Sequence, residues 1–210
     1  MDEGPVVVVL AAGRGARFSA ARCGHKLAQS FGDMTVLGST LSQVVASGLA
    51  RVVVTTPALR ELAIPWVDES DLVVLPPLDD GDPTRGMGDS IAAGVMARPL
   101  ASGWLLLPGD LPLIQAATLC AVAAALPEQL VVHAQHRGRR GHPVGFDPAL
   151  YSELAALRGD EGARRLLARY PALAVEVPDA GVRMDLDTEA DLLALRALHA
   201  ARVATAAEAG

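Results

Sequence analysis

The amino-acid sequence predicts an α/β fold in which helices flank a mostly parallel β-sheet. Two observations support this prediction. Short runs rich in β-branched residues alternate along the chain with segments of helical periodicity, which is the pattern of a parallel sheet with helical connections. The first run, Val6–Leu10, is apolar throughout, as expected for a strand that is buried on both faces. Sheets of this type bind ligands beyond the carboxyl ends of their strands.

The elements of the first two thirds follow from this alternation. Val6–Leu10 is bounded by Pro5, and helical spacing of apolar residues follows from Val36 to Val45, with Gly48 where a helix normally stops. The further elements are expected in this order: strands at Arg51–Thr55 and Leu72–Leu75, a loop at Asp79–Gly88, a helix from Asp89 or Ser90 to Ala97, a strand at Trp104–Leu107, a helix at Thr118–Leu126 and a strand at Leu130–Ala134.

The pattern changes after residue 135. Gly138–Gly141 has the composition of a hairpin turn, and Asp147 with Pro148 forms a good helix start. Thr188 opens the last helix, for which Asp191 completes an approximate capping box. The expected elements are a short strand at Pro143–Phe146, a helix after Asp147, a helix at Asp160–Arg169, a strand at Ala174–Val177 and a helix from Thr188 to about Ala204.

Length and composition restrict the class of protein. The 210 residues suffice for one buried core, and a second independent core is not expected. The net charge of −6 gives no overall attraction to nucleic acid or to a membrane surface, so any anion site must be local. The acidic start and the two isolated cysteines, Cys23 and Cys120, suggest neither a signal segment nor a disulfide framework. We therefore expect a cytoplasmic protein.

Lys26 stands out from the other basic residues. Lysine and arginine total 18, and Lys26 is the single lysine among them, which suggests a gene that replaces lysine by arginine wherever either will do. An ammonium is a compact point charge whereas a guanidinium is a planar fork, so a site built for lysine is not satisfied by arginine. Lys26 is therefore a candidate functional residue. The alternative is a lysine that survived by chance on a solvated surface.

A glycine-containing turn follows the first strand and precedes Lys26. In such a turn, backbone N–H groups can face a phosphate without interference from side chains. The positive charges of Arg14, Arg17 and Lys26 surround it, so the segment suits a triphosphate. The third glycine of a dinucleotide fingerprint and the Gly-Lys-Ser/Thr of a P-loop are absent. The predicted phosphate-binding residues are Ala11, Ala12, Gly13, Arg14 and Gly15.

Carboxylates at two places could hold a cation. Asp110 follows Gly109 directly after a predicted buried strand, where it could ligate Mg²⁺ together with substrate phosphates, although an Asp that only caps a turn is also common. Asp185 and Asp187 alternate, so they share one face of an extended segment. We take Asp185 as the second candidate ligand, because Asp187 also fits a helix N-terminus.

Two further segments suggest binding surfaces. Small residues at Gly86–Ser90 permit close approach to a ring, and the Ser90 hydroxyl could bond a base edge or simply cap a helix. Arg139, His142 and Arg164 lie near glycine turns, which suggests a site for a second anionic substrate. The alternative is a structural histidine and a solvated face of arginines.

Taken together, these segments resemble the molybdenum cofactor cytidylyltransferase-like family of the nucleoside-triphosphate transferase superfamily. The resemblance runs from the first strand to the last helix. It is carried by Leu10–Phe18 with Lys26, by the Gly86–Ser90 loop and Leu107–Pro112, and by Gly141–Pro143, Gly159–Ala163 and Asp185–Leu192. It implies a three-layer, Rossmann-like sheet with a small C-terminal substrate-binding lobe. It also implies one domain over 1–205, with a nucleotide-binding part at 1–135, an acceptor-binding part at 136–185 and a tail at 206–210.

The resemblance also implies an activity and its residues. CMP would pass from CTP to a molybdopterin-type molybdenum cofactor with release of pyrophosphate, and the product could go to a client molybdoenzyme. Mg²⁺ would lie at Asp110 and Asp185, and the base near Pro76 and Ser90. Lys26, Arg17 and Asp110 would be the catalytic residues. Relatives that use GTP carry Leu-Ala-Gly-Gly where this chain has Leu-Ala-Ala-Gly at 10–13, which favours cytosine.

The chain departs from the family pattern at two places. Asp33–Gly38 lacks the usual Gly-x-Pro-Leu, and Asp187–Asp191 lacks the usual proline. These departures leave the acceptor open. A sugar phosphate or polyol phosphate is an alternative acceptor within the same fold. A non-catalytic module that carries a cofactor to a molybdoenzyme is an alternative of another class.

Overall fold

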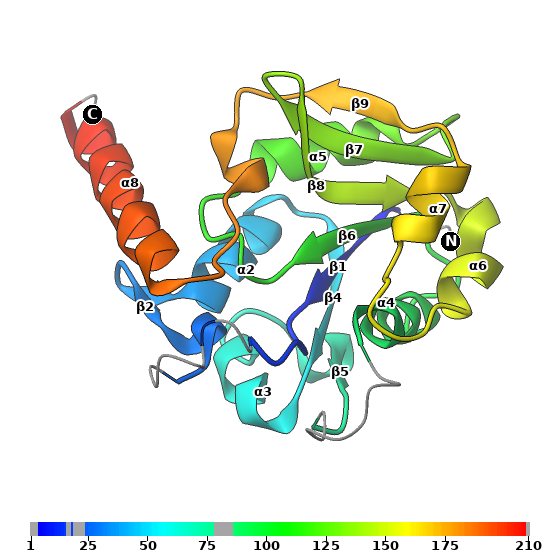
Figure 1. Cartoon of the computed structure of the whole chain (residues 1–210), viewed down its shortest axis with the longest axis horizontal. Helices are drawn as coiled ribbons and strands as arrows, with labels where there is room; N and C mark the ends of the chain where they lie inside the picture. Colours follow the sequence, from blue (N-terminus) through cyan, green and yellow to red (C-terminus); the bar gives the residue numbers. More distant parts are fainter. Residues whose placement is uncertain (1–3, 16–17, 19–23, 78–85, 209–210) are drawn as a thin grey trace.

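The computed structural model describes residues 4–15, 18, 24–77 and 86–208. Helices cover both faces of a seven-stranded sheet, which confirms the predicted three-layer α/β fold (Figure 1). The strands lie in the order β5-β4-β1-β6-β8-β7-β9. Their bounds are β1 Val6–Leu10, β4 Ala50–Thr55, β5 Leu72–Val74, β6 Trp104–Pro108, β7 Val131–His136, β8 Arg139–Phe146 and β9 Leu173–Glu176, and a separate pair consists of β2 Ser30–Phe31 and β3 Met34–Thr35.

The helices form the two outer layers. One face of the sheet is covered by α2 and α5, and the other by α4, α6 and α7. The bounds are α2 Val36–Ala46, α3 Pro57–Ala63, α4 Met87–Met96, α5 Ala116–Ala125, α6 Tyr151–Ala155, α7 Arg164–Arg169 and α8 Glu189–Glu208, with short 3₁₀ turns η1 Lys26–Ala28, η2 Glu69–Asp71, η3 Pro148–Leu150 and η4 Ala180–Arg183. In the part of the chain that is described, no helix is long and apolar enough to cross a membrane.

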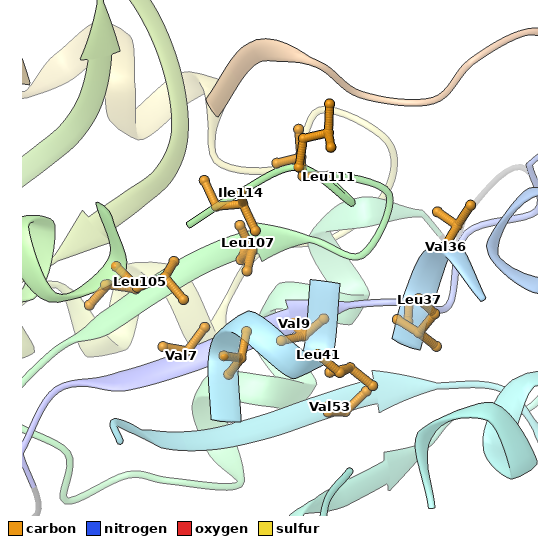
Figure 2. Packing of buried hydrophobic residues seen from close by; sticks show 14 of the residues in the cluster. Val7, Val9, Val36, Leu37, Leu41, Val53, Leu105, Leu107, Leu111 and Ile114 are labelled. Carbon is orange, nitrogen blue, oxygen red and sulfur yellow. The ribbon is translucent and has the colours of Figure 1, made fainter. Parts of the chain in front are cut away.

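The all-apolar sequence of β1 is explained by burial on both faces. Val7 and Val9 point to the core under α2 and α5, and Val6 and Val8 point to the core on the α4 side. Figure 2 shows the first of these cores, where Val7 and Val9 lie near Leu41 of α2. β1 lies between β4 and β6, and this position determines where the turn after its carboxyl end lies.

One antiparallel strand brings the second half of the chain to the same edge as the first. β1, β4, β5 and β6 run parallel, but β8 runs antiparallel to β6, with Leu106 opposite Val144. The first residues of β8 therefore lie beside the last residues of β6. The sheet thus gathers the turn after β1, the segment after β6 and the start of β8 at one edge, where such folds bind ligands.

The region 136–185 is built on this same sheet. β8 and β9 are strands of it, and α6 and α7 pack on the α4 side through Leu154 and Leu166. The hairpin turn differs from its predicted position, since Arg137 and Gly138 form it with φ values of 51° and 72°, and β8 begins at Arg139. Glu176 of β9 accepts hydrogen bonds from both turn N–H groups, a tertiary contact that the local sequence does not indicate.

Three helix boundaries also differ from the predictions. The α4 helix begins at Met87 because Asp89 accepts a hydrogen bond from the N–H of Gly86, which stands at the N-cap. The α7 helix begins only at Arg164, because Gly159 and Gly162 have φ values of +67° and +55°, which no α-helix can accommodate. The α8 helix continues to Glu208, beyond the expected end at Ala204.

A buried carboxylate fixes the segment that leads into α8. Asp179 is 1% exposed, and it accepts hydrogen bonds from Gln115 N, Thr118 Oγ1 and Gly181 N, each at 2.9 Å. Its charge also caps the N-terminus of α5, where a carboxylate is favourable. Asp179 therefore ties η4, and the residues that follow it, to the start of α5.

We expect Asp179→Ala to lower the free energy of unfolding by about 2–4 kcal/mol, because it leaves buried donors without acceptors. Urea denaturation followed by circular dichroism measures this change. Asp147→Ala is the matched control, since Asp147 caps η3 with an exposed hydrogen bond to Ala149 N and should cost about 1 kcal/mol. Equal losses in the two variants would show that Asp179 does not anchor the segment.

Candidate functional site

Three segments that are distant in sequence meet around the ammonium of Lys26. The Nζ atom lies 2.5 Å from Asp110 Oδ2, 2.8 Å from the carbonyl oxygen of Leu186 and 3.4 Å from Asp187 Oδ1. The side chains of Lys26 and Asp110 are only 16% and 13% exposed. Lys26 is therefore no solvated surface residue, and the chance-survivor interpretation of this single lysine does not fit its surroundings.

His25, directly before Lys26, connects η1 to the turn after β1 by hydrogen bonds. The Nδ1 atom of His25 accepts a hydrogen bond from Leu27 N at 3.2 Å and so caps η1, which contains Lys26. The other ring nitrogen, Nε2, must then carry the proton, and it donates to Gly13 O at 2.9 Å. Gly15 has a φ of +61°, and a Cβ built there would lie 3.3 Å from Lys26 Cγ. The predicted phosphate-binding turn thus lies against the stem of Lys26.

The backbone around Asp110 is held from several sides. Gly109 donates to the carbonyl oxygen of Leu10 at 3.0 Å, and its own carbonyl oxygen accepts from Thr40 Oγ1 at 3.0 Å. A Cβ at Gly109 would lie 3.2 Å from Leu10 O, so a side chain there would press on the turn after β1. The carbonyl oxygen of Asp110 accepts from Leu186 N at 3.1 Å, which fixes the last segment beside it.

The second carboxylate oxygen of Asp110, Oδ1, differs from Oδ2 in its surroundings. Oδ1 is buried, and no hydrogen bond to it is present among the described residues. A buried carboxylate oxygen without a partner is costly, and a hard cation such as Mg²⁺ is the kind of ligand that would satisfy it. In the described residues no three His, Cys, Asp or Glu side chains are grouped to hold a metal by themselves.

The two alternating carboxylates of the last segment have different surroundings. Asp187 reaches Lys26, whereas Asp185 is exposed. The preference for Asp185 as a metal ligand stays a prediction, and the contact with Lys26 is made by Asp187. Asp185 lies within electrostatic reach of His142, since its charge, like that of Asp110, acts to raise the pKa of that imidazole.

The pKa of His142 in β8 lies below the ordinary value for histidine. Removal of its ring from water lowers the pKa of His142 more than the two nearby carboxylates raise it. Its Nδ1 atom is buried without a hydrogen-bond partner among the described residues. An imidazole with a lowered pKa, and with one ring nitrogen that no described residue pairs, therefore lies at the same edge as Asp110.

The glycine-rich start of α4 packs against a loop from the second half of the chain. Asp89 Oδ2 accepts from Gly86 N and from Gly159 N, both at 2.9 Å, and Gly88 N donates to Gly159 O at 2.8 Å. A Cβ at Gly88 would lie 2.8 Å from the backbone of Arg158. The close approach that these small residues permit is therefore used by the chain itself, while Ser90 is 8% exposed on α4.

The remaining predicted residues are dispersed around this centre. Ala11 and Ala12 are buried and Gly13 and Arg14 exposed in the turn after β1, and Pro76 is exposed beyond β5. Arg139 and Arg164, at the starts of β8 and α7, are exposed, and among the described residues no hydrogen bond or ion pair joins them to the Lys26 cluster. Arg17 lies outside the described residues.

Sequence reasoning assigned no role to His25 and gave Asp89 only as a possible helix start. The position of His25 directly before the single lysine was a usable signal. The second partner of Asp89, Gly159, is 70 residues away, so nothing local indicated that contact.

The chain is similar to known proteins over most of its length. The family model described as "MobA-like NTP transferase domain" matches residues 7–177. The purine catabolism protein PucB of Bacillus subtilis (strain 168) is 35% identical over 112 residues, which make up 51% of this chain and 54% of PucB. The alignment therefore spans about half the length of that curated relative.

Solved structures match more completely. Rv0371c from Mycobacterium tuberculosis H37Rv is 29% identical with a TM-score of 0.77, over 93% of this chain and 98% of that one. Another structure of Rv0371c, a complex with manganese, is 28% identical with a TM-score of 0.74 over the same shares of both chains. A Methanothermobacter nucleotidyl transferase is 25% identical with a TM-score of 0.75, over 95% of this chain and 99% of that one.

We expect Asp89→Ala to free the start of α4 from the loop at Gly159. Amide hydrogen exchange should become at least tenfold faster at residues 86–89 and 158–160, because two N–H groups lose their acceptor. Glu161→Ala is the control from the same loop, since the exposed carboxylate of Glu161 forms an ion pair with the exposed Arg165. Unchanged exchange at Gly159 in Asp89→Ala would contradict the proposed link.

Proposed function

The chain belongs to the MobA-like NTP transferase domain family and is a nucleotidyltransferase, and we propose that it transfers CMP from CTP to a molybdopterin-type molybdenum cofactor, releasing pyrophosphate. The observation that carries this proposal is the cluster of Lys26, Asp110 and Asp187 beside the glycine turn after β1. A cation and two carboxylates next to backbone N–H groups suit a triphosphate with a divalent ion.

A divalent cation is part of this proposal. The buried Oδ1 of Asp110, for which the described ranges offer no hydrogen-bond partner, supports it, and the manganese complex of Rv0371c shows that a relative of this chain binds such an ion. We propose Mg²⁺, held by Asp110 and by Asp187 or Asp185. Asp187 has the better support because it already shares Lys26 with Asp110. The ion would supply charge neutralisation at the substrate phosphates.

The protein would act mainly by position and charge. The backbone of Ala11–Gly15 would bind the triphosphate, and Lys26 would neutralise the charge that develops on the leaving pyrophosphate. An oxygen of the acceptor phosphate would attack the α-phosphorus, and the bond from that phosphorus to the oxygen shared with the β-phosphate would break. The acceptor oxygen is already an anion near neutral pH, so no general base is required. Arg17 stays a predicted further cation at this step.

The choice of substrates rests on finer features. Ala12 stands where GTP-using relatives carry glycine, which supports CTP. The exposed Arg139 and Arg140 at the start of β8 support a large anionic acceptor such as a molybdopterin over a small polyol phosphate. His142 and Arg164 complete the proposed acceptor surface, and the product would pass to a client molybdoenzyme.

Pyrophosphate release in the presence of Mg²⁺ tests the proposed reaction. CTP, GTP, ATP and UTP are each supplied with and without molybdenum-loaded molybdopterin, and we expect release only with CTP and the pterin together. Release with a sugar phosphate or polyol phosphate in place of the pterin would move the acceptor to that class. Pterin binding without release from any nucleotide would instead support a carrier module, and Asp110→Ala would then leave cofactor delivery intact.

The variant Lys26→Arg tests the lysine itself. We expect turnover to fall at least tenfold, because a planar guanidinium cannot replace an ammonium that is approached by three oxygens. Arg165→Lys, an exposed exchange on α7, is the control and should keep full turnover. Wild-type kcat in Lys26→Arg would show that the ammonium has no special role in transfer.

A further inference from the structure

We infer that in the free enzyme the ammonium of Lys26 occupies the cation position at Asp110, so that the divalent ion enters with the nucleotide and not before it. This inference rests on the proposed function, because it concerns the same ion and the same triphosphate. Its basis is the set of three oxygens around Nζ, from Asp110, Asp187 and Leu186. These are two carboxylates and a carbonyl, which are also the oxygen types that a hard cation selects.

The ammonium and the divalent ion exclude each other at this position. Nζ lies 2.5 Å from Asp110 Oδ2, within the distance of a strong charge-assisted hydrogen bond. An ion bound to the same oxygen would stand within a few ångströms of the ammonium, where the two positive charges repel with little water between them. The largely buried side chains of Lys26 and Asp110 keep this repulsion from being screened by salt.

The contact is nevertheless incomplete, which makes it exchangeable. Lys26 satisfies one oxygen of Asp110, and the other, Oδ1, is buried without a hydrogen-bond partner in the part of the chain that the structure describes. A metal ion can bind carboxylates through one or both oxygens, so it has an interaction to gain that the ammonium does not use. Lys26 therefore neutralises the charge of Asp110 in the free site, but it uses fewer of the carboxylate oxygens than a metal ion can.

The triphosphate can draw the ammonium away. The stem of Lys26 lies against Gly15, with its Cγ 3.3 Å from the position of a Cβ on that glycine, so its base is fixed beside the phosphate-binding turn. The end of the chain can rotate about its own bonds, and phosphate oxygens on the turn would offer it a new partner. Asp110 would then be free for the ion. By linkage, nucleotide and metal each raise the affinity of the other.

The test measures binding of Mn²⁺ alone, by the electron paramagnetic resonance signal of the free ion, to the full chain without nucleotide. We expect Lys26→Met to bind Mn²⁺ at least tenfold more tightly than the wild type. The double variant Lys26→Met/Asp110→Asn should lose this tight site. A non-hydrolysable CTP analogue should raise the Mn²⁺ affinity of the wild type at least tenfold. Arg165→Met removes an exposed positive charge elsewhere and should leave the affinity unchanged.

Equal Mn²⁺ affinity in Lys26→Met and the wild type would overturn the inference, and so would a tight site that survives Asp110→Asn. Thermal unfolding of each variant establishes that it is folded, and Lys26→Gln replaces Lys26→Met if the latter is not. Failure of the inference differs from failure of the proposed function. Equal affinities with intact CMP transfer reject only the lysine–metal exchange, whereas tight Mn²⁺ binding by Lys26→Met without transfer by the wild type rejects only the reaction.

Discussion

The ion pair between Lys26 and Asp110 is the contact on which the site depends, because it joins the segments after β1 and β6. Leu186 completes the junction, since its N–H donates to Asp110 O and its carbonyl oxygen accepts from Lys26. A parallel sheet places the ends of β1 and β6 side by side, and the antiparallel β8 brings the second half of the chain to the same edge. The arrangement of strands therefore comes first, and the charges at their ends use it.

Some buried polar atoms at this edge of the sheet lack hydrogen bonds that a purely structural site would make. Asp179, which only fixes the chain, has each of its oxygens hydrogen-bonded. Asp110 and His142 each keep a buried polar atom without a partner among the described residues. Such atoms cost free energy of folding, and they concentrate where a ligand supplies the missing partner. The contrast between Asp179 and Asp110 supports the proposal that Asp110 binds a ligand, whereas the hydrogen bonds of Asp179 are made within the chain.

The sequence predicted the features that local patterns determine. The bounds predicted for the first strand, Val6–Leu10, were correct, because a strand that is buried on both faces is apolar along its whole length. The sequence favoured Asp185 over Asp187 only because Asp187 also fits a helix N-terminus. It could not show their different surroundings, because alternation puts both on one face and the position of the segment is set by contacts of Asp179 at the start of α5. The late start of α7 depends on positive φ at Gly159 and Gly162, and composition alone does not show which glycines adopt it.

The presence of a single lysine in the chain can be related to the geometry of the oxygens around it. A guanidinium presents its donors in one plane, whereas the oxygens around Lys26 come from a strand end, a backbone carbonyl and a helix start. A compact ammonium on a rotatable stem can meet all three and can also leave them for a phosphate. Wherever a basic residue needs only charge or a planar fork, arginine serves, and the chain uses it. The proposed movement of the ammonium between two sets of oxygens would explain why one lysine is kept.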